Sequence, residues 1–125
     1  MRFDMSGDEG SVAASRLGDT MVAIEAGAVL HVMDDDGEGR AVDLAVRFGL
    51  VAPPGRRGLV VETARGPMRL RVGAEVQVVP SPRAGWVELP WLVAPLCTRL
   101  GILALAPVGE ELALVLDVDR LWDDT

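Results

Sequence analysis

The segment GLVVETARGPMRLRV, residues 58–72, carries the strongest structural pattern in the chain. An apolar run leads into a turn at Arg65-Gly66-Pro67, and strict alternation of apolar and basic residues follows. Side chains alternate between the two faces of a strand, so this pattern predicts a β-hairpin with one buried and one solvated face. The buried face would carry Met68, Leu70 and Val72, and the solvated face Arg69 and Arg71.

Short strands separated by glycine and proline are predicted along most of the chain. The expected strands are MVAIEAGAVLHVM (21–33, broken at Gly27), AEVQVVP (74–80) and LALVLDV (112–118), and short helical pieces are expected in LAVRFGL (44–50) and LPWLVAPLCTRL (89–100). Such spacing favours small β-barrels or a sandwich. The small and acidic residues 1–20 are predicted to form a flexible N-terminal tail, and 21–125 a single domain.

The composition excludes several classes of partner and environment. The net charge of −7 argues against a nucleic-acid-binding protein. The clustered basic residues are therefore expected to form a solvated strand face; they are Arg56, Arg57, Arg65, Arg69 and Arg71. A single cysteine, no segment typical of an export signal, and a longest apolar run broken by Arg99 and three prolines predict a cytoplasmic protein without membrane insertion.

Neither catalysis nor cofactor binding is predicted. Cys97 and His31 are the only Cys and His, and Cys97 lies among aliphatic residues, where a buried thiol is the usual outcome. These two residues are too few for a zinc site. The acidic run from Asp34 resembles the start of a calcium loop, but Ala45 stands where the final bidentate Glu is needed. We therefore expect no enzyme, no metal and no cofactor.

Two aspartates are predicted to cap short helical turns at strand ends. Asp43 and Asp117 each follow a turn and an apolar strand, and an aromatic residue, Phe48 or Trp122, comes five positions later. A carboxylate at such a position accepts hydrogen bonds from the free backbone N–H groups of the following turn. The repeated pattern indicates two similar subdomains, and it makes this role a better interpretation of Asp117 and Asp119 than a catalytic carboxylate pair.

Four segments together resemble the CheW-like family, the coupling proteins of bacterial chemosensory arrays. They are VAIEAGAVLHV (22–32), AVDLAVRFGL (41–50), GLVVETARGPMRLRVGAEVQVVPSP (58–82) and LGILALAPVGEELALVLDVDRLW (100–122). The resemblance is carried by their order and spacing. It implies an all-β fold of two intertwined five-stranded SH3-like barrels, with a CheW-like domain over residues 21–125.

The first barrel is predicted to be reduced. The chain passes from Val32 to Arg40 through MDDDGEG, without the Asn-Leu-Arg-Gly motif of the family and without a proline before Asp43. MDDDGEG is therefore interpreted as a short, solvated acidic turn in place of a longer loop and strand, whose carboxylates bind nothing. His31 stands where the family commonly has an acidic residue. Such abbreviated chains resemble the accessory coupling proteins of frizzy-type pathways in gliding bacteria.

The resemblance implies an adaptor that binds the cytoplasmic tip of a chemoreceptor in the groove between the barrels. The candidate binding residues are Val29, His31 and Val32 on the strand that borders the groove, and the tryptophans Trp86 and Trp91. The alternative for the two valines is a place in the core, and for the two tryptophans core filling between the barrels is the favoured interpretation. The reduced barrel puts contact with the histidine kinase regulatory domain in doubt and leaves open pairing with another CheW-like protein. Two alternatives remain: a module that self-associates into a homo-oligomer through an exposed strand edge, and a β-barrel that binds a small ligand.

Overall fold

A computed structural model describes residues 10–35, 40–51 and 54–122 of the chain. The strands are β1 (Ser11–Leu17), β2 (Thr20–Glu25), β3 (Val29–Asp34), β4 (Val42–Asp43), β5 (Arg57–Thr63), β6 (Gly66–Val72), β7 (Val76–Pro80), β8 (Ile102–Val108) and β9 (Glu111–Leu116). The helices are α2 (Leu44–Arg47) and α3 (Ala94–Leu100), with 3-10 turns η1 (Ala26–Ala28), η2 (Arg83–Gly85) and η3 (Val118–Arg120).

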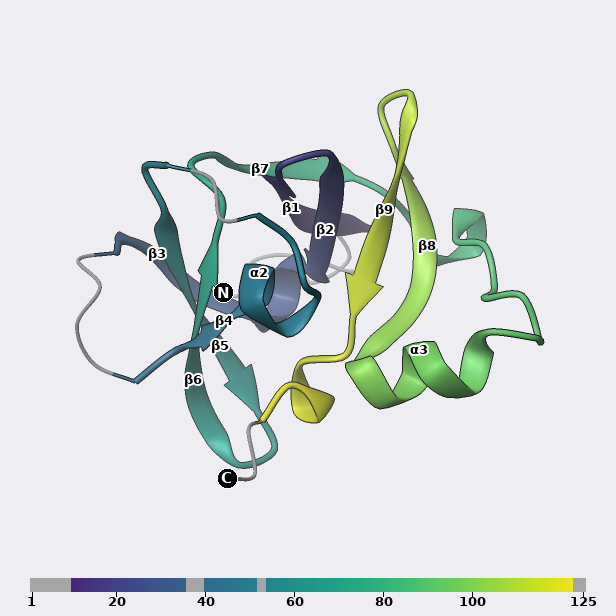
Figure 1. The fold of residues 1–125 in the computed structure, drawn as a ribbon. Helices are drawn as coiled ribbons and strands as arrows, with labels where there is room; N and C mark the ends of the chain where they lie inside the picture. The colour runs from purple at the N-terminus through teal and green to yellow at the C-terminus, as the bar shows by residue number, and fades with distance from the viewer. Residues whose placement is uncertain (1–9, 36–39, 52–53, 123–125) are drawn as a thin grey trace.

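The described strands form two intertwined sheets (Figure 1). One sheet has five strands in the order β7-β1-β2-β9-β8, and the other has four in the order β3-β5-β6-β4. The chain leaves the five-stranded sheet after β2 and returns to it after β6, and β2 then pairs in parallel with β9 near the end of the chain. The five-stranded sheet is thus built from both ends of the sequence, and the predicted all-β fold of two intertwined units is confirmed.

The four-stranded sheet is the reduced unit that the sequence predicted. Its edge strand β4 contains two residues, which pair in parallel with Leu70 and Arg71 of β6. The prediction of two short strands around Gly27 is confirmed by β2, η1 and β3. A bulge between Val29 and His31 interrupts the pairing of β3 with β5 and alters which side chains of β3 face the core.

The predicted β-hairpin is present as β5 and β6. Their antiparallel register runs from Arg57 opposite Val72 to Thr63 opposite Gly66. The turn therefore lies at residues 64–65, and Gly66 and Pro67, which the sequence placed in the turn, begin β6. Met68, Leu70 and Val72 are buried, as the alternation predicts. The helical turns α2 and α3 also lie in the two segments where the sequence placed them.

The prediction of a flexible tail over residues 1–20 is wrong for Ser11–Leu17, which form β1. This strand lies between β2 and β7 in the five-stranded sheet, and Val12 and Leu17 are fully buried. Its small residues Ala13 and Ala14 gave too little hydrophobic signal to indicate a strand, although they pack well where neighbouring strands pair on both sides. Residues 1–9 lie outside the described part of the chain.

The main core lies between the sheets. Its buried members come from both sheets, from α2 and from the segment after η3; they are Leu17, Val22, Ile24, Leu44, Leu59, Val61, Met68, Leu70, Val72, Ile102, Leu116 and Leu121. Figure 1 shows α2 between the two sheets, and its Leu44 is fully buried. None of the helices in the described residues is long and apolar enough to cross a membrane.

The two sheets approach one another closely at Gly73, which follows β6. Its N–H donates to the Oγ of buried Ser15 in β1, at 2.9 Å. A Cβ on Gly73 would lie 2.0 Å from the carbonyl oxygen of Arg16. Backbone atoms cannot retreat from such a contact as the end of a side chain can, so only glycine fits here without a shift of one sheet against the other.

We predict that Gly73→Ala destabilises the fold by about 3 kcal/mol, because overpacking forces the backbone of β1 or β6 to move. Urea denaturation followed by circular dichroism measures the change. Gly85→Ala is the control, because no atom lies within 4 Å of the added Cβ. An unfolding midpoint for Gly73→Ala equal to that of the unchanged protein would show that the close approach does not constrain the sheets.

Candidate partner-binding surface

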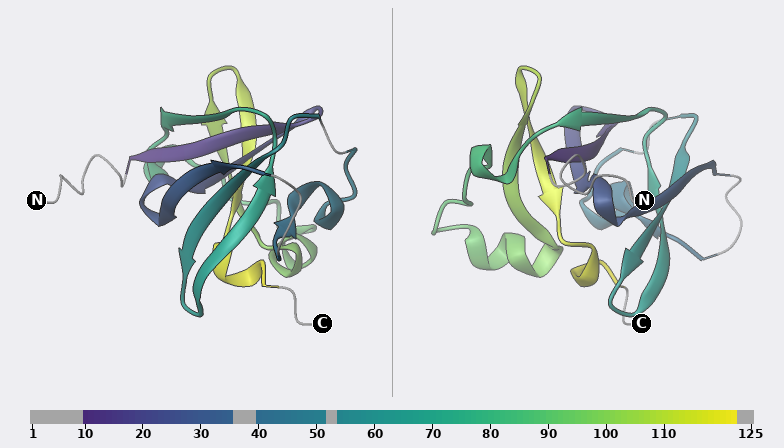
Figure 2. Two further views of the ribbon diagram at one scale, coloured as in Figure 1. Left: turned by 90° about the vertical axis from the view of Figure 1, so that its left-hand side faces the viewer. Right: turned by 180° about the vertical axis from the view of Figure 1, so that it is seen from behind.

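The described residues do not bring catalytic groups together. His31 lies on β3 and Cys97 on α3, two elements on opposite sides of the molecule in the views of Figures 1 and 2. Within residues 10–35, 40–51 and 54–122, no group of three or more His, Cys, Asp or Glu could hold a metal ion. His31 and Cys97 therefore do not form a Cys-His couple, and the candidate sites that remain are surfaces that could bind a partner.

Asp117 and Asp119 hold a turn in place. The carboxylate of Asp117 accepts from the N–H of Asp119 at 3.1 Å, at the start of η3. The carboxylate of Asp119 accepts from the N–H of Ala64 at 2.7 Å, in the hairpin turn between β5 and β6. The carboxylate of Asp117 therefore caps η3, and the carboxylate of Asp119 binds the hairpin turn to η3.

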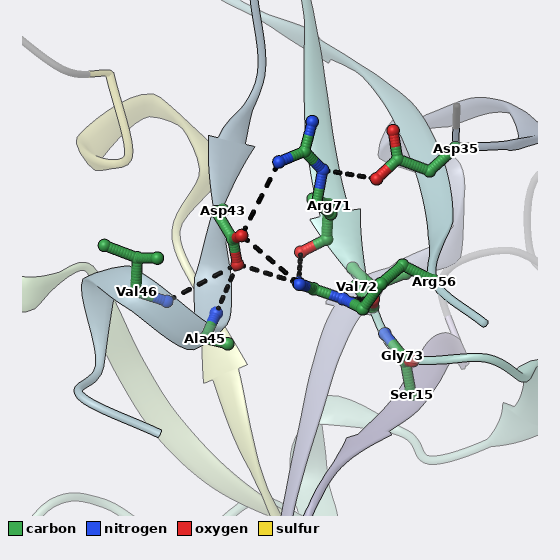
Figure 3. Close-up of polar contacts among 9 residues, drawn as sticks. All are labelled: Ser15, Asp35, Asp43, Ala45, Val46, Arg56, Arg71, Val72 and Gly73. Carbon is green, nitrogen blue, oxygen red and sulfur yellow. Dashed lines mark hydrogen bonds and ion pairs between the residues drawn. The ribbon is translucent and has the colours of Figure 1, made fainter. Parts of the chain in front are cut away.

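Asp43 lies where β4 ends and α2 begins, and it is the centre of an ion-pair cluster (Figure 3). Its Oδ1 accepts from the N–H groups of Ala45 and Val46, at 3.0 and 3.4 Å. Arg56 donates to both oxygens of the same carboxylate, at 2.7 Å from Nη2 to Oδ1 and 3.2 Å from Nη1 to Oδ2. One side chain therefore caps a helix and binds a guanidinium in a bidentate manner.

The cluster extends through Arg71 to Asp35. Nη1 of Arg71 lies 3.7 Å from Oδ2 of Asp43, and its Nε pairs with the carboxylate of Asp35. The side chain of Asp35 is 3% exposed, and those of Arg56 and Arg71 are largely buried. Figure 3 shows that Arg71 lies between the two carboxylates.

Two sequence expectations are corrected by this cluster. The arginine face is not uniformly solvated, because Arg56 and Arg71 are drawn inward by carboxylates from β4 and from the end of β3. The MDDDGEG segment is not a turn whose carboxylates bind nothing, because Asp35 is buried and paired. Met33 and Asp34, which the sequence placed in that turn, end strand β3, and residues 36–39 lie outside the described part of the chain.

The environment of Asp43 lowers its pKa. Burial alone would raise the pKa of this carboxyl, but the hydrogen bonds and charge of Arg56 and the N–H groups of Val46 and Ala45 outweigh it. All of these partners interact with the ionised form, so proton binding to Asp43 opposes folding.

A groove runs between the edges of the two sheets. Its walls come from β3, from the start of β5, and from the connection into β7; the lining residues are Val32, Arg57, Ala74, Glu75, Val76 and Gln77. Aliphatic groups from both sheets thus lie beside one cation, one anion and one amide. Such a surface suits an apolar side chain with polar groups around it.

The three candidate residues on β3 have different environments. Val32 is 41% exposed and lines the groove, and His31 is also exposed. Val29 is half-buried and packs against the main core, on the other side of the bulge. Of the three, Val32 is the one whose side chain a partner in the groove would contact.

Trp86 has a structural environment. Its indole packs against the smaller core clusters of the five-stranded sheet, and its Nε1 donates to the carbonyl of Ser81 at 3.0 Å. The guanidinium of Arg83 lies over the ring, 5.4 Å from its centroid. These contacts match the core-filling interpretation left open by the sequence.

Trp91 is 83% exposed and lies three residues before the first residue of α3. It therefore lies on the opposite side of the molecule from β3, as Figures 1 and 2 show for the two elements. Its neighbour Leu92 is 73% exposed. The candidate residues from the sequence thus do not form one surface, but lie in a groove, in the core and beside α3.

Sequence reasoning missed the second wall of the groove. Ala74, Glu75 and Gln77 follow the hairpin and carry no motif, and their position depends on where the chain re-enters the five-stranded sheet. The exposed leucines around α3 were also missed. Their regular spacing, Leu92 followed by Leu96, was the signal that could have indicated an apolar stripe.

Comparison with known proteins identifies the fold. The chain matches no protein-family model and no curated protein sequence. It is similar in structure to the scaffolding protein TtCheW from Thermoanaerobacter tengcongensis, with a TM-score of 0.73 and 16% sequence identity over 92% of this chain and 93% of that one. The predicted CheW-like fold is therefore confirmed over nearly the whole of both chains.

We predict that Asp43→Ala destabilises the protein by about 2–3 kcal/mol at pH 7, because it removes a helix cap and leaves Arg56 without its carboxylate. The folded-state pKa of Asp43 is lowered, so its contribution is present above the unfolded pKa of about 3.9 and is lost as the pH falls through the folded value. Urea denaturation at pH 7 and at lower pH should show the difference between the two proteins shrinking in acid.

Asp34→Ala is the matched control for this prediction. Its carboxylate is exposed and lies 3.9 Å from Nε of Arg57, so its loss is expected to cost less than about 1 kcal/mol. Equal effects of the two substitutions at pH 7, or an effect of Asp43→Ala that does not change with pH, would contradict the role assigned to the Asp43 cluster.

Proposed function

We propose that this protein is a non-enzymatic coupling adaptor of a bacterial chemosensory array, acting in the cytoplasm. The observation that carries the proposal is the fold shared with the scaffolding protein TtCheW over almost the full length of both chains. Small β-barrels host many functions, but a match of this extent includes both sheets and their exchange of strands. The abbreviated sequence resembles the accessory coupling proteins of frizzy-type pathways, so such a pathway is one setting for this adaptor.

We further propose that the inter-sheet groove binds the helical cytoplasmic tip of a chemoreceptor. Val32, Ala74 and Val76 supply aliphatic contacts from both walls, and Arg57 and Glu75 supply charges of both signs. An amphipathic helix buries its apolar face in such a groove while its polar residues meet the charged borders. His31 is exposed at the adjacent position of β3 but does not line the groove, so we propose for it a place at the rim of this contact and not in it.

The reduced sheet supports a weakened contact with the histidine kinase regulatory domain. β4 has two residues, and its place in the sheet is held by the Asp43 cluster. A partner that needs a full fifth strand in this barrel would lose part of its contact area, and small losses matter in interfaces of modest size. The protein would then bind receptors and cap or space them in the array.

The prediction is that Val32→Asp weakens binding of the receptor-tip fragment from the same cell by at least about ten-fold, because it places a charge in the apolar contact. Leu112→Asp is the control, since Leu112 is 55% exposed on β9 and does not line the groove. Isothermal titration calorimetry measures both variants, after circular dichroism has shown that each is folded.

The kinase regulatory domain is titrated separately. No binding to the receptor tip or to the kinase domain would overturn the adaptor proposal, whereas firm binding to the kinase domain would overturn only the weakened contact. Light scattering of the same samples tests the alternative of a self-associating module. A protein that stays monomeric at high concentration argues against that alternative.

A further inference from the structure

A second apolar surface lies around α3, and we call Trp91, Leu92, Leu96 and Arg99 the α3 surface. Leu96 is 59% exposed, and Trp91 and Leu92 are more exposed still. The N–H of Ala94 donates to the carbonyl of Pro90, and that of Cys97 to the carbonyl of Val93, so the helical geometry begins before α3 itself. Leu92, Leu96 and Arg99 are therefore spaced by four and three residues along one side of a helix.

The packing of α3 does not require these side chains. Cys97 and Leu100 are half-buried and pack against the main core. Leu92 and Leu96 lie beside this core-facing stripe and remain exposed in the described part of the chain. Exposed apolar side chains that include a large indole are typical of a protein-binding surface.

The charge around this surface differs from that of the rest of the chain. The protein has 19 acidic residues, yet residues 89–109 contain no Asp or Glu, and Arg99 is their only charged residue. Arg47 adds a second guanidinium at the end of the helix, where it donates to the carbonyls of Leu100 and Arg120, each at 2.9 Å. Neither Arg47 nor Arg99 forms an ion pair with a carboxylate of the described residues.

We propose that the α3 surface docks an amphipathic helix of a partner protein whose apolar stripe is flanked by Asp or Glu. Trp91, Leu92 and Leu96 would bury the stripe, and Arg99 and Arg47 would pair with the flanking carboxylates. Arg99 forms no ion pair with a carboxylate of the described residues, so its guanidinium is available to the partner's acidic residues.

A second copy of the chain fits the surface less well. A two-fold symmetric contact places the same patch on both sides of the interface. It would bring together two copies of Arg99, and residues 89–109 would supply no carboxylate to either. The charge pattern therefore favours a different, acidic partner.

The α3 surface lies away from the proposed receptor groove. Figures 1 and 2 show α3 and β3 on opposite sides of the molecule. A helix on the α3 surface would leave the groove open, so the protein could join two partners at once. The inference goes beyond the receptor contact and stands independently of it, because it depends on different residues.

Two synthetic helical peptides with the same leucine stripe, one flanked by Glu and the other by Lys, test the proposal on the full chain. Nuclear magnetic resonance of the 15N-labelled protein locates the contact, and the change of its amide shifts with peptide concentration gives the affinity. The Glu peptide is expected to shift the amides of residues 91–99, to bind at least about ten-fold more tightly than the Lys peptide, and to weaken as salt is added.

Three substitutions sharpen the test. Leu96→Asp is expected to weaken the Glu peptide at least about ten-fold, and Arg99→Glu to remove its advantage over the Lys peptide. Leu112→Asp, at a leucine of similar exposure on β9, should leave binding unchanged.

Several results would overturn the proposal. One is the absence of amide chemical-shift changes at residues 91–99 when the Glu peptide is added. The others are equal affinities of the protein for the two peptides, and an affinity of the Leu96→Asp variant for the Glu peptide equal to that of the unchanged protein. A chain that dimerises in sedimentation velocity and becomes monomeric on Leu96→Asp would overturn it in favour of a second copy. This experiment does not measure binding of the receptor tip. The α3 proposal can therefore fail while the adaptor proposal stands, and the adaptor proposal can fail while the α3 proposal stands.

Discussion

The carboxylate of Asp43 holds the edge of the reduced sheet. β4 pairs with β6 through two residues, which is too short a ladder to fix a strand by backbone hydrogen bonds alone. The same carboxylate caps α2, accepts two bonds from Arg56 and lies beside Arg71, so side-chain contacts replace the missing length of strand. A partly buried carboxylate and guanidinium are favourable only when their hydrogen bonds are satisfied, and here the backbone N–H groups of α2 help to satisfy them.

The cluster also connects the sheet edge to the junction between the sheets. Arg56 donates from Nε to the carbonyl of Val72, at 2.6 Å, and the N–H of Arg57 donates to the carbonyl of Gly73. Gly73 in turn donates to Ser15 of β1, at the point where no larger residue fits. Arg57 and Ala74, which line the groove, are adjacent to this chain of contacts. The groove walls are therefore set by bonded backbone and not by a loop that must order itself when a partner binds.

Local patterns predicted the parts of this fold that depend on neighbours in sequence. The alternation in residues 58–72 gave the hairpin, and the position of Asp43 gave its hydrogen bonds to α2. The burial of Asp35 could not be predicted in the same way, because Arg71 is brought to it by the pairing of distant strands. The tryptophans show the same limit: Trp86 is covered because Ser81 offers a carbonyl and the five-stranded sheet an apolar surface, whereas Trp91 precedes a helix whose inner side is already filled.

The distribution of charge gives the two proposed surfaces different roles. The chain has a net charge of −7, so an acidic helix is repelled by most of its surface and attracted at Arg47 and Arg99, which form no ion pair with a carboxylate of the described residues. The groove, in contrast, has Arg57 and Glu75 on its borders and has no preference for one sign of charge. Charge at α3 would therefore select and orient one class of partner, while shape and apolar contact at the groove would select another. An adaptor with two such surfaces on opposite sides of the molecule can hold two helices at once, because a helix on one surface leaves the other surface open.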